Sequence, residues 1–322
     1  MLTKPTVKLA IMLSLLIIVS VVGVVVWQFY GHEKVTTGPI TIIDDMGRNV
    51  TITNYPPQRI VSLVPSCTEI LFALGVGDKV VGVDETSDYP PEVIERVEAG
   101  NLTTVGKYSQ INVELVVSLE PDLILASGAK VQGAVVERLV ELGQTVVVLY
   151  PETFSDVLEN ILLVGKVTGQ VDKAEALVAD MRKKAQEIAD KTKNASRPRV
   201  YVEYYFDGGY ATYGSKSFVN ELIDMAGGIN IFAGFEGAYI TTSTEEVLKA
   251  NPEIIIIAKG KMSMLCGLTP ETIKSRPGWS QISAVQNDRI YEIGEDLLVA
   301  KGPRLIKGLE ELAKVIHPEL FS

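Results

Sequence analysis

RIVSLVPSCTEILFALGVGDKVVGVD, residues 59–84, contains the pattern on which the fold prediction rests: an apolar run, a helical stretch and a second apolar run. Residues 112–126, NVELVVSLEPDLILA, and residues 251–260, NPEIIIIAKG, each add a further run next to a Pro-Asp or Pro-Glu pair. Short uninterrupted runs of β-favouring residues are typical of strands buried in a parallel sheet. Because the pattern occurs in both halves of the chain, we expect two α/β lobes with a binding cleft between them.

The order of apolar runs, glycines and prolines predicts alternating strands and helices in each lobe. We expect an N-terminal lobe over residues 59–152, a C-terminal lobe over residues 199–322, and a β-hairpin at residues 40–52 within a spacer of residues 32–58. The predicted strands are residues 59–65, 79–83, 123–126, 145–149, 199–204, 253–258 and 289–293. The predicted helices are residues 68–74, 92–96, 112–119, 131–142, 217–225, 244–249, 270–275 and 303–316.

Residues 153–198 are expected to form a helical segment that connects the lobes. Residues 153–193 contain no proline, and Gly165 and Gly169 are their only glycines. Apolar residues recur at spacings of three and four, at Ala174, Leu177, Val178, Met181, Ala185 and Ile188. This spacing predicts an amphipathic helix of about 20 residues, about 30 Å long. Such a helix would join the lobes and limit their hinge motion; the alternative is an ordinary surface helix of one lobe.

Residues 9–31 contain no Asp, Glu, Lys or Arg. At about 1.5 Å per residue, a helix of this length spans a hydrocarbon core of about 30 Å, so we expect a transmembrane helix. Lys4 and Lys8, in a stub of residues 1–8, favour a cytoplasmic N-terminus and an extracytoplasmic position for the rest of the chain. A cleaved signal peptide is the alternative, although no Ala-x-Ala-like site follows the run. No cysteine stands at its end, which argues against a lipoprotein anchor.

The chain of 322 residues has a formal net charge of −10. This charge argues against nucleic acid as a partner and suits a soluble ectodomain that docks on a basic surface. We expect the protein to be a monomer. Its two cysteines, Cys67 and Cys266, fall in opposite predicted lobes, and we expect both to be buried and unpaired. Asn49, Asn101 and Asn194 begin Asn-x-Ser/Thr tripeptides in segments expected to be exposed, and the sequence leaves their glycosylation open.

The residue types on which most catalytic sites depend are scarce. His32 and His317 are the two histidines, and they stand near opposite ends of the chain. They do not suit a Ser-His-Asp or Cys-His system or a zinc site in a cleft. No GxxxxGK[ST] or GxGxxG motif follows a predicted strand. We therefore expect a binding protein rather than an enzyme, with no catalytic residue, no cofactor and no protein-bound metal site.

Aromatic residues gather in segments that we expect to lie outside the strands: Tyr89, Tyr108, Tyr205, Phe206, Tyr210, Tyr213 and Tyr239. Tyrosines on loops between lobes offer flat apolar area with a polar tip, which suits a large ligand rich in rings. Positive charge for an anionic chelate is available at Lys216, Lys259, Lys261 and Arg304. The alternative for each is an ordinary half-buried tyrosine or a surface cation.

Three blocks together resemble a known family: residues 62–93, residues 105–126 (VGKYSQINVELVVSLEPDLILA) and residues 241–257 (TTSTEEVLKANPEIIII). They look like the signature blocks of the iron-complex and vitamin B12 substrate-binding proteins of ABC importers. The resemblance implies the class III periplasmic-binding-protein fold, with two Rossmann-like lobes joined by a single long helix. It also implies capture of a metal chelate, namely a ferric siderophore, haem or a corrinoid, and its delivery to an ABC permease dimer with its ATPase.

The resemblance also implies roles for individual residues. In the family, one exposed glutamate on each lobe docks into arginine pockets of the permease, and these match Glu114 and Glu245 here. A glutamate at a helix start that interacts with the helix dipole is the alternative at each position.

For the ligand, the resemblance implicates Tyr108 and the loop of residues 296–300, of which we select Asp296, Leu297 and Leu298. Tyr205, Tyr239 and Lys259 complete the predicted ligand-binding set. Other aromatic positions of the B12-binding members correspond to Thr86 and Ser127 here, so the class of chelate stays open. The alternative function is a surface-anchored sensor ectodomain with the same fold.

Overall fold

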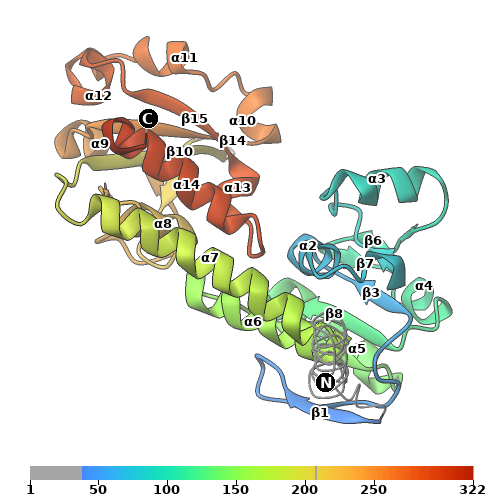
Figure 1. Cartoon of the computed structure of the whole chain (residues 1–322). Helices are drawn as coiled ribbons and strands as arrows, with labels where there is room; N and C mark the ends of the chain where they lie inside the picture. Colours follow the sequence, from blue (N-terminus) through green and yellow to red (C-terminus); the bar gives the residue numbers. More distant parts are fainter. Residues whose placement is uncertain (1–37, 207–208, 322) are drawn as a thin grey trace, which may run out of the picture. The chain divides into compact units, whose positions relative to one another are not determined.

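Two β-sheets, each covered by helices on both faces, organise the part of the chain that the computed structural model describes, residues 38–206 and 209–321 (Figure 1). We call the first sheet with its helices the N-terminal lobe and the second sheet with its helices the C-terminal lobe. The predicted stub and transmembrane helix, residues 1–31, lie outside the described residues. Within the described ranges, no helix is both long enough and apolar enough to cross a membrane.

The N-terminal lobe is built on five parallel strands. In spatial order they are β5 (Thr103–Thr104), β4 (Val80–Val83), β3 (Ile60–Ser62), β8 (Leu123–Ser127) and β9 (Val146–Leu149). Its helices are α2 (Pro65–Ala73), α3 (Pro91–Glu98), α4 (Val113–Ser118) and α5 (Gly133–Glu141), with short 3-10 helices η1 (Gly77–Lys79) and η2 (Lys130–Gln132). Two antiparallel hairpins accompany it, β1 (Ile40–Ile43) with β2 (Asn49–Ile52), as predicted, and β6 (Gly106–Lys107) with β7 (Gln110–Ile111).

The C-terminal lobe has a mixed sheet of six strands. In spatial order they are β13 (Tyr239–Thr242), β11 (Gly209–Tyr213), β10 (Arg199–Phe206), β14 (Ile254–Lys259) and β15 (Ile290–Gly294), and β12 (Ile229–Asn230) also pairs with β10. Strands β11 and β13 pair antiparallel and the others parallel. Its helices are α8 (Phe218–Met225), α9 (Thr244–Ala250), α10 (Lys261–Leu265), α11 (Pro270–Lys274), η3 (Trp279–Gln281), α12 (Ser283–Gln286), α13 (Glu295–Val299), α14 (Leu305–Ile316) and η4 (Pro318–Leu320).

The apolar runs of the sequence form the central strands, as predicted. The first four residues of β8 and the first five of β14 are buried, because helices cover both faces of each sheet. In the C-terminal lobe, α8 and α14 cover one face while α9, α11 and α12 cover the other. The expectation of α/β architecture is confirmed at this level.

The expectation that five aromatic residues lie outside the strands is wrong: Tyr205, Phe206, Tyr210, Tyr213 and Tyr239. They belong to β10, β11 and β13, which form the antiparallel part of the second sheet. Tyrosine and threonine favour strands that are half buried, and such strands lack the continuous aliphatic run by which the central strands are recognised.

The two cysteines differ in exposure. Cys67 on α2 is buried, as predicted, and burial strongly raises the pKa of its thiol. Cys266, just beyond α10, is exposed, so the expectation that both are buried is wrong for this residue. Both are unpaired.

The same local contact secures the central strand of each lobe. In the N-terminal lobe, the Asp122 carboxylate accepts hydrogen bonds from the backbone N–H groups of Gln58 and Arg59, and the Arg59 guanidinium donates to the Leu119 carbonyl. In the C-terminal lobe, the Glu253 carboxylate accepts from the Arg199 backbone N–H, and the Arg199 guanidinium donates to the Asn251 carbonyl. The Pro-Asp and Pro-Glu pairs of the sequence thus mark the turns that bring neighbouring parallel strands together.

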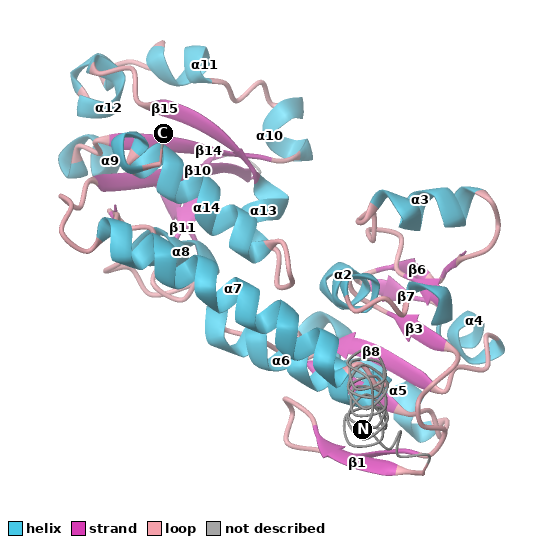
Figure 2. Cartoon of the chain, in the orientation of Figure 1, coloured by secondary structure: helices cyan, strands magenta, loops and turns pink. Residues whose placement is uncertain are grey.

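The segment between the lobes contains two helices, α6 (Phe154–Thr168) and α7 (Val171–Thr192), which pack side by side (Figure 2). Gly169, with φ of +74°, ends α6 in the left-handed conformation that favours glycine. The predicted helix of about 20 residues corresponds to α7, which has 22. Near its start, Lys173 Nζ donates to the Leu74 carbonyl at 3.2 Å, and at its end Thr192 lies against Gly227. One long helix therefore contacts both lobes.

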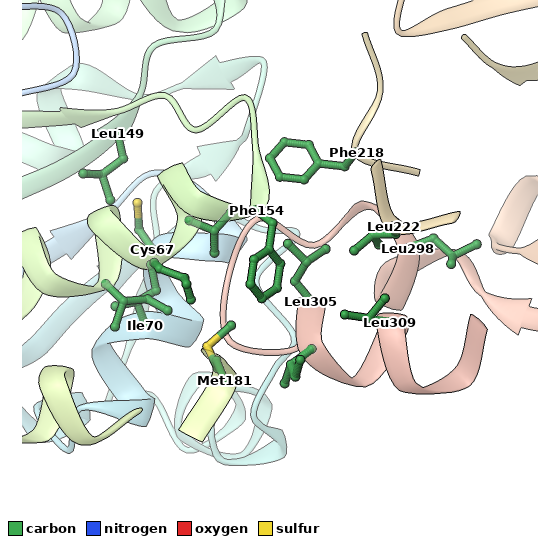
Figure 3. Close-up of a cluster of buried hydrophobic side chains, with 14 of the residues drawn as sticks. Cys67, Ile70, Leu149, Phe154, Met181, Phe218, Leu222, Leu298, Leu305 and Leu309 are labelled. Carbon is green, nitrogen blue, oxygen red and sulfur yellow. The ribbon is translucent and has the colours of Figure 1, made fainter. Parts of the chain in front are cut away.

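A single apolar core runs from one lobe to the other around these helices (Figure 3). Cys67 and Ile70 enter it from the N-terminal lobe, and Leu305 and Leu309 enter it from the C-terminal lobe. Phe154 of α6 lies between the two groups. Separating the lobes would expose this surface to water.

A buried ion pair also crosses between the lobes. Arg304, next to α14, donates through Nη2 to the Glu69 carboxylate of α2 at 2.7 Å, and through Nη1 to Asp296 of α13. The guanidinium carbon lies 4.2 Å from the ring centre of Tyr89, which precedes α3. The side chain of Glu69 is 4% exposed and that of Arg304 12%. Burial raises the pKa of Glu69, and the hydrogen bond from Arg304 opposes the rise.

Replacing Gly165 with alanine is expected to destabilise the fold. The added Cβ would lie 2.3 Å from the Cβ of Ala174, so α6 and α7 would have to move apart. Overpacking of this kind costs about 1–3 kcal/mol. Urea unfolding of a chain of residues 39–322, which form one compact unit, measures the effect. In the control Gly133→Ala, the new Cβ meets no atom within 4 Å. An equal effect of the two changes would contradict the close packing of α6 on α7.

Arg304→Met is expected to destabilise the fold by about 3 kcal/mol near neutral pH, because it leaves a buried carboxylate without its cation. Loss of Arg304 raises the pKa of Glu69 further. A carboxyl group whose pKa is higher in the folded state binds more protons there, so stability falls as the pH rises from the unfolded to the folded pKa. Urea unfolding should therefore show that Arg304→Met lowers the free energy of unfolding more at about pH 8 than at about pH 5.

The double variant Glu69→Gln/Arg304→Met removes the titrating carboxyl and provides the control. Its loss of stability should be the same at the two pH values. A pH-independent loss in Arg304→Met alone would show that Glu69 does not depend on Arg304 for its charge.

Candidate functional site

A cavity of about 360 Å³ lies between the two lobes. The N-terminal lobe lines it with Ala129, Tyr150 and Glu152, which follow β8 and β9. The C-terminal lobe lines it with residues at the end of β11, the start of α8, the start of β13 and the loop after α13: Tyr213, Lys216, Ser217, Phe218, Val219, Ala238, Tyr239, Val299 and Lys301. Crevices at the carboxyl ends of parallel strands are the usual ligand sites of α/β folds. This cavity is therefore the candidate site.

Tyr213 and Tyr239 of the second sheet line one wall of the cavity, and Tyr204 of the same sheet packs against both. The ring of Tyr204 lies 4.8 Å from that of Tyr213 and 5.8 Å from that of Tyr239, between centroids. The Tyr213 hydroxyl is buried, and it has no hydrogen-bond partner among the described residues. Burial, and to a lesser degree the charge of Glu295, raises the pKa of Tyr213 strongly and that of Tyr239 in the same direction. All three phenols are neutral at physiological pH and can donate a hydrogen bond.

Lys301 brings a positive charge to the cavity. Its Nζ donates to the Pro151 carbonyl at 3.0 Å, and it lies over the rings of Tyr150 and Phe218, 5.5 Å and 5.0 Å from their centres. Burial lowers the pKa of this ammonium group, while the charge of Glu152 acts in the opposite direction. The lysine of one lobe thus reaches the backbone of the other.

Two of the predicted ligand residues approach the cleft from opposite lobes. Tyr239 lines the cavity and is 63% exposed. Tyr108 lies in the turn between β6 and β7, where its hydroxyl is 3.4 Å from Oγ of Ser127. The Tyr108 hydroxyl is also close enough to raise the pKa of Tyr239 slightly. The fold therefore brings together two tyrosines that are far apart in the sequence.

Apart from Tyr239, none of the predicted ligand residues with a described side chain is in the lining of this cavity, and this includes Tyr108. Lys259 pairs with Glu292, with 2.6 Å between Nζ and Oε2. Asp296 pairs with Arg304, Leu297 packs against the core, and Leu298 is fully buried in it. Tyr205 is in β10, and its side chain lies outside the described residues. The assignment of these residues to the ligand site stays a prediction.

The two predicted docking glutamates are both exposed at helix starts. Glu114 is in the first turn of α4, and Glu245 is in the first turn of α9. Neither makes a side-chain hydrogen bond or ion pair with another described residue. Glu246, next to Glu245, instead accepts hydrogen bonds from the Ser243 backbone N–H and the Thr242 hydroxyl, which lower its pKa. Glu246 therefore caps the start of its own helix, whereas the carboxylate of Glu245 remains available for a contact with another molecule.

Sequence reasoning missed Lys301, Tyr150 and Phe218 as cavity residues. Tyr150 immediately follows the predicted strand of residues 145–149, so the rule that ligands bind at the carboxyl ends of parallel strands points to it. Lys301 lies one residue beyond residues 296–300, which we predicted to be a loop but which the structure shows to be mostly helix α13. Nothing in the local sequence distinguishes Phe218 from a core residue.

Comparison with known proteins identifies the family. The profile of the periplasmic binding proteins matches residues 60–297. The chain is 36% identical over 296 residues to the uncharacterized ABC transporter substrate-binding lipoprotein YvrC of Bacillus subtilis (strain 168), covering 90% of this chain and 89% of that protein. It is 31% identical over 264 residues to the vitamin B12-binding protein of Vibrio cholerae, covering 80% and 88%. The solved periplasmic heme-binding protein RhuT from Roseiflexus sp. RS-1, in apo form, superposes with a TM-score of 0.71 at 25% identity, covering 82% and 99%. The chain therefore belongs to the periplasmic binding protein family.

Proposed function

We propose that this chain is the substrate-binding component of an ABC importer. The observation that carries the proposal is a family match that extends over both lobes, between which the cavity lies. Relatives are named for ABC transport, for vitamin B12 and for heme. The cargo is a metal complex of this kind: cobalamin or another corrinoid, haem, or a ferric siderophore. The protein binds it between lobes of residues 59–152 and 199–322, joined through residues 153–198, and passes it to a permease dimer with its ATPase.

The proposed position of the protein is outside the cell membrane. Residues 9–31, with Lys4 and Lys8 before them, have the length and charge distribution of a membrane anchor with its N-terminus inside. An anchor of this type keeps the binding lobes close to the permease. A cleaved signal peptide would release the same lobes, and the N-terminal sequence of the mature protein distinguishes the two.

The geometry supports a contact of the ligand with both lobes. Tyr239 reaches the cavity from the C-terminal lobe, and Tyr108 approaches it from the N-terminal lobe. Neutral phenols provide flat apolar area for a planar macrocycle and a hydroxyl for its polar edge. The protein thus retains its cargo by enclosure rather than by chemistry on it.

Tyr239→Ala is expected to weaken cargo binding about tenfold, equivalent to about 1.4 kcal/mol, by removing an exposed aromatic contact from the cavity wall. The measurement is quenching of intrinsic fluorescence of the purified chain by cobalamin, haem and a set of ferric siderophores. Tyr291→Ala, a change on β15 outside the lining of the cavity, serves as the control. If the unaltered chain binds no member of the panel, the proposed function is wrong.

The proposed docking surface consists of Glu114 and Glu245, one on each lobe. Each is exposed and unpaired among the described residues, so its carboxylate can form a charge-assisted contact with an arginine of the permease. Two such charges on separate lobes can engage two permease subunits at once. Glu246 is excluded from this role because its carboxylate is used within α9.

The double variant Glu114→Arg/Glu245→Arg is expected to keep cargo affinity while abolishing uptake, since it places like charges opposite each other at both contacts. Uptake of labelled cargo into cells or vesicles with the permease, measured beside equilibrium binding, tests this expectation. The matched control is Glu137→Arg/Glu271→Arg, which reverses one exposed acid on α5 and one in the first turn of α11. Normal uptake by the first double variant would refute the docking assignment.

A further inference from the structure

The ammonium group of Lys301 has spare hydrogen-bonding capacity inside the cavity. A lysine ammonium carries three donors. Its one hydrogen bond to a described residue goes to the Pro151 carbonyl at 3.0 Å. Within residues 38–206 and 209–321, no carboxylate forms an ion pair with its nitrogen, although Glu152 is on the same cavity wall and its charge favours the ammonium form. The structure thus holds a cation in place without an acidic partner.

Two aromatic rings fix the position of this cation. The rings of Tyr150, from the N-terminal lobe, and Phe218, from the C-terminal lobe, both lie within 5.5 Å of the nitrogen. Cation–π contact stabilises the charged form and restricts where the ammonium can move. Burial disfavours the charged form of the ammonium group. An anion bound in the cavity would offset this cost of burial.

Other groups at the same cavity also favour negative charge. Ser217, Phe218 and Val219 at the start of α8 line it, and the start of a helix carries partial positive charge on its free N–H groups. The first turn of α8 also contains Glu221, but this carboxylate accepts a hydrogen bond from the Phe154 backbone N–H. The Tyr213 hydroxyl, on the same cavity, is a buried donor without a partner among the described residues.

We propose that Lys301, with the start of α8 and the Tyr213 hydroxyl, binds an oxyanion of the transported metal complex. This inference rests on the proposed function and adds which chemical group of the cargo the cavity recognises. Two sources have this chemistry: the phosphodiester in the nucleotide loop of a complete cobalamin, and the propionate carboxylates of haem. The macrocycle then lies against the tyrosine wall while its oxyanion is held at Lys301.

Matched pairs of probes separate the two sources. Cobinamide lacks the nucleotide loop of cobalamin with its phosphodiester linkage to the base, and haem dimethyl ester lacks the carboxylate charges of haem. The full-length chain in detergent is titrated with all four compounds, followed by absorbance or calorimetry. The unaltered chain should bind one oxyanion-bearing compound at least tenfold more tightly than its analogue, and the pair that shows this difference identifies the group.

Lys301→Met keeps the apolar stem and removes the charge. This variant should no longer bind the oxyanion-bearing compound of that pair more tightly than its analogue. Its affinity for the analogue should match that of the unaltered chain, which also shows that the variant is folded. Lys173→Met is the matched control, because its ammonium group also donates to a backbone carbonyl of the N-terminal lobe, that of Leu74 at 3.2 Å, but does not line the cavity. It should keep the preference. If Lys301→Met binds neither compound, the variant Lys301→Arg, which keeps a positive charge, is measured instead. A preference of this variant for the oxyanion-bearing compound supports the proposal, and the absence of that preference overturns it.

The remaining outcomes separate this inference from the function on which it rests. An unchanged preference in Lys301→Met overturns the role of Lys301 and leaves the import function standing. If the unaltered chain binds a ferric siderophore but none of these four compounds, the role of Lys301 is likewise overturned and the import function stands. If it binds nothing in the wider panel, the proposed function fails and the inference fails with it.

Discussion

The structure depends on one apolar contact, the burial of Phe154 and its neighbours where the interiors of the two lobes meet. Phe154 on α6 and Met181 on α7 lie between side chains of α2 on one side and of α14 on the other. Each large apolar side chain buried in this way contributes about 1.5–3 kcal/mol. Because the core is continuous, the lobes cannot part without exposing it. The cavity at their junction therefore has walls of nearly fixed spacing, and selection among ligands depends on the shape and charge of those walls.

The central architecture could be predicted because its strands are buried on both faces. Such strands require long aliphatic runs, and β8 and β14 stand out in the sequence for that reason. Strands β11 and β13 could not be recognised in this way, since tyrosine and threonine occur in loops as well as in edge strands. Whether they form strands depends on pairing with β10, which is a tertiary contact. The transmembrane helix predicted for residues 9–31 falls in a part of the chain that the structure does not describe.

The candidate site was only partly predictable, because its properties arise from residues far apart in the chain. The resemblance to a family pointed to Tyr108, and composition pointed to Tyr239, yet their approach across the cleft depends on the docking of two separate sheets. Lys301 looks like any surface lysine in the sequence. Its importance comes from Tyr150 and Pro151, about half the chain away, which fix its position and leave donors free. Glu245 and Glu246 are likewise indistinguishable until the capping hydrogen bonds of α9 are known.

Helix α7 contacts the N-terminal lobe near its first turn and the C-terminal lobe at its last turn. The length of α7 therefore sets how the two lobes are placed relative to each other. Inserting or deleting one residue within α7 would shift one lobe by about 1.5 Å along the helix axis and rotate it by about 100° relative to the other. The tyrosine wall and the loop of Tyr150 would then no longer face the same cavity. The number of residues in α7 is therefore under stronger constraint than their identity on its exposed face. Changes in chain length that preserve binding are confined to the loops.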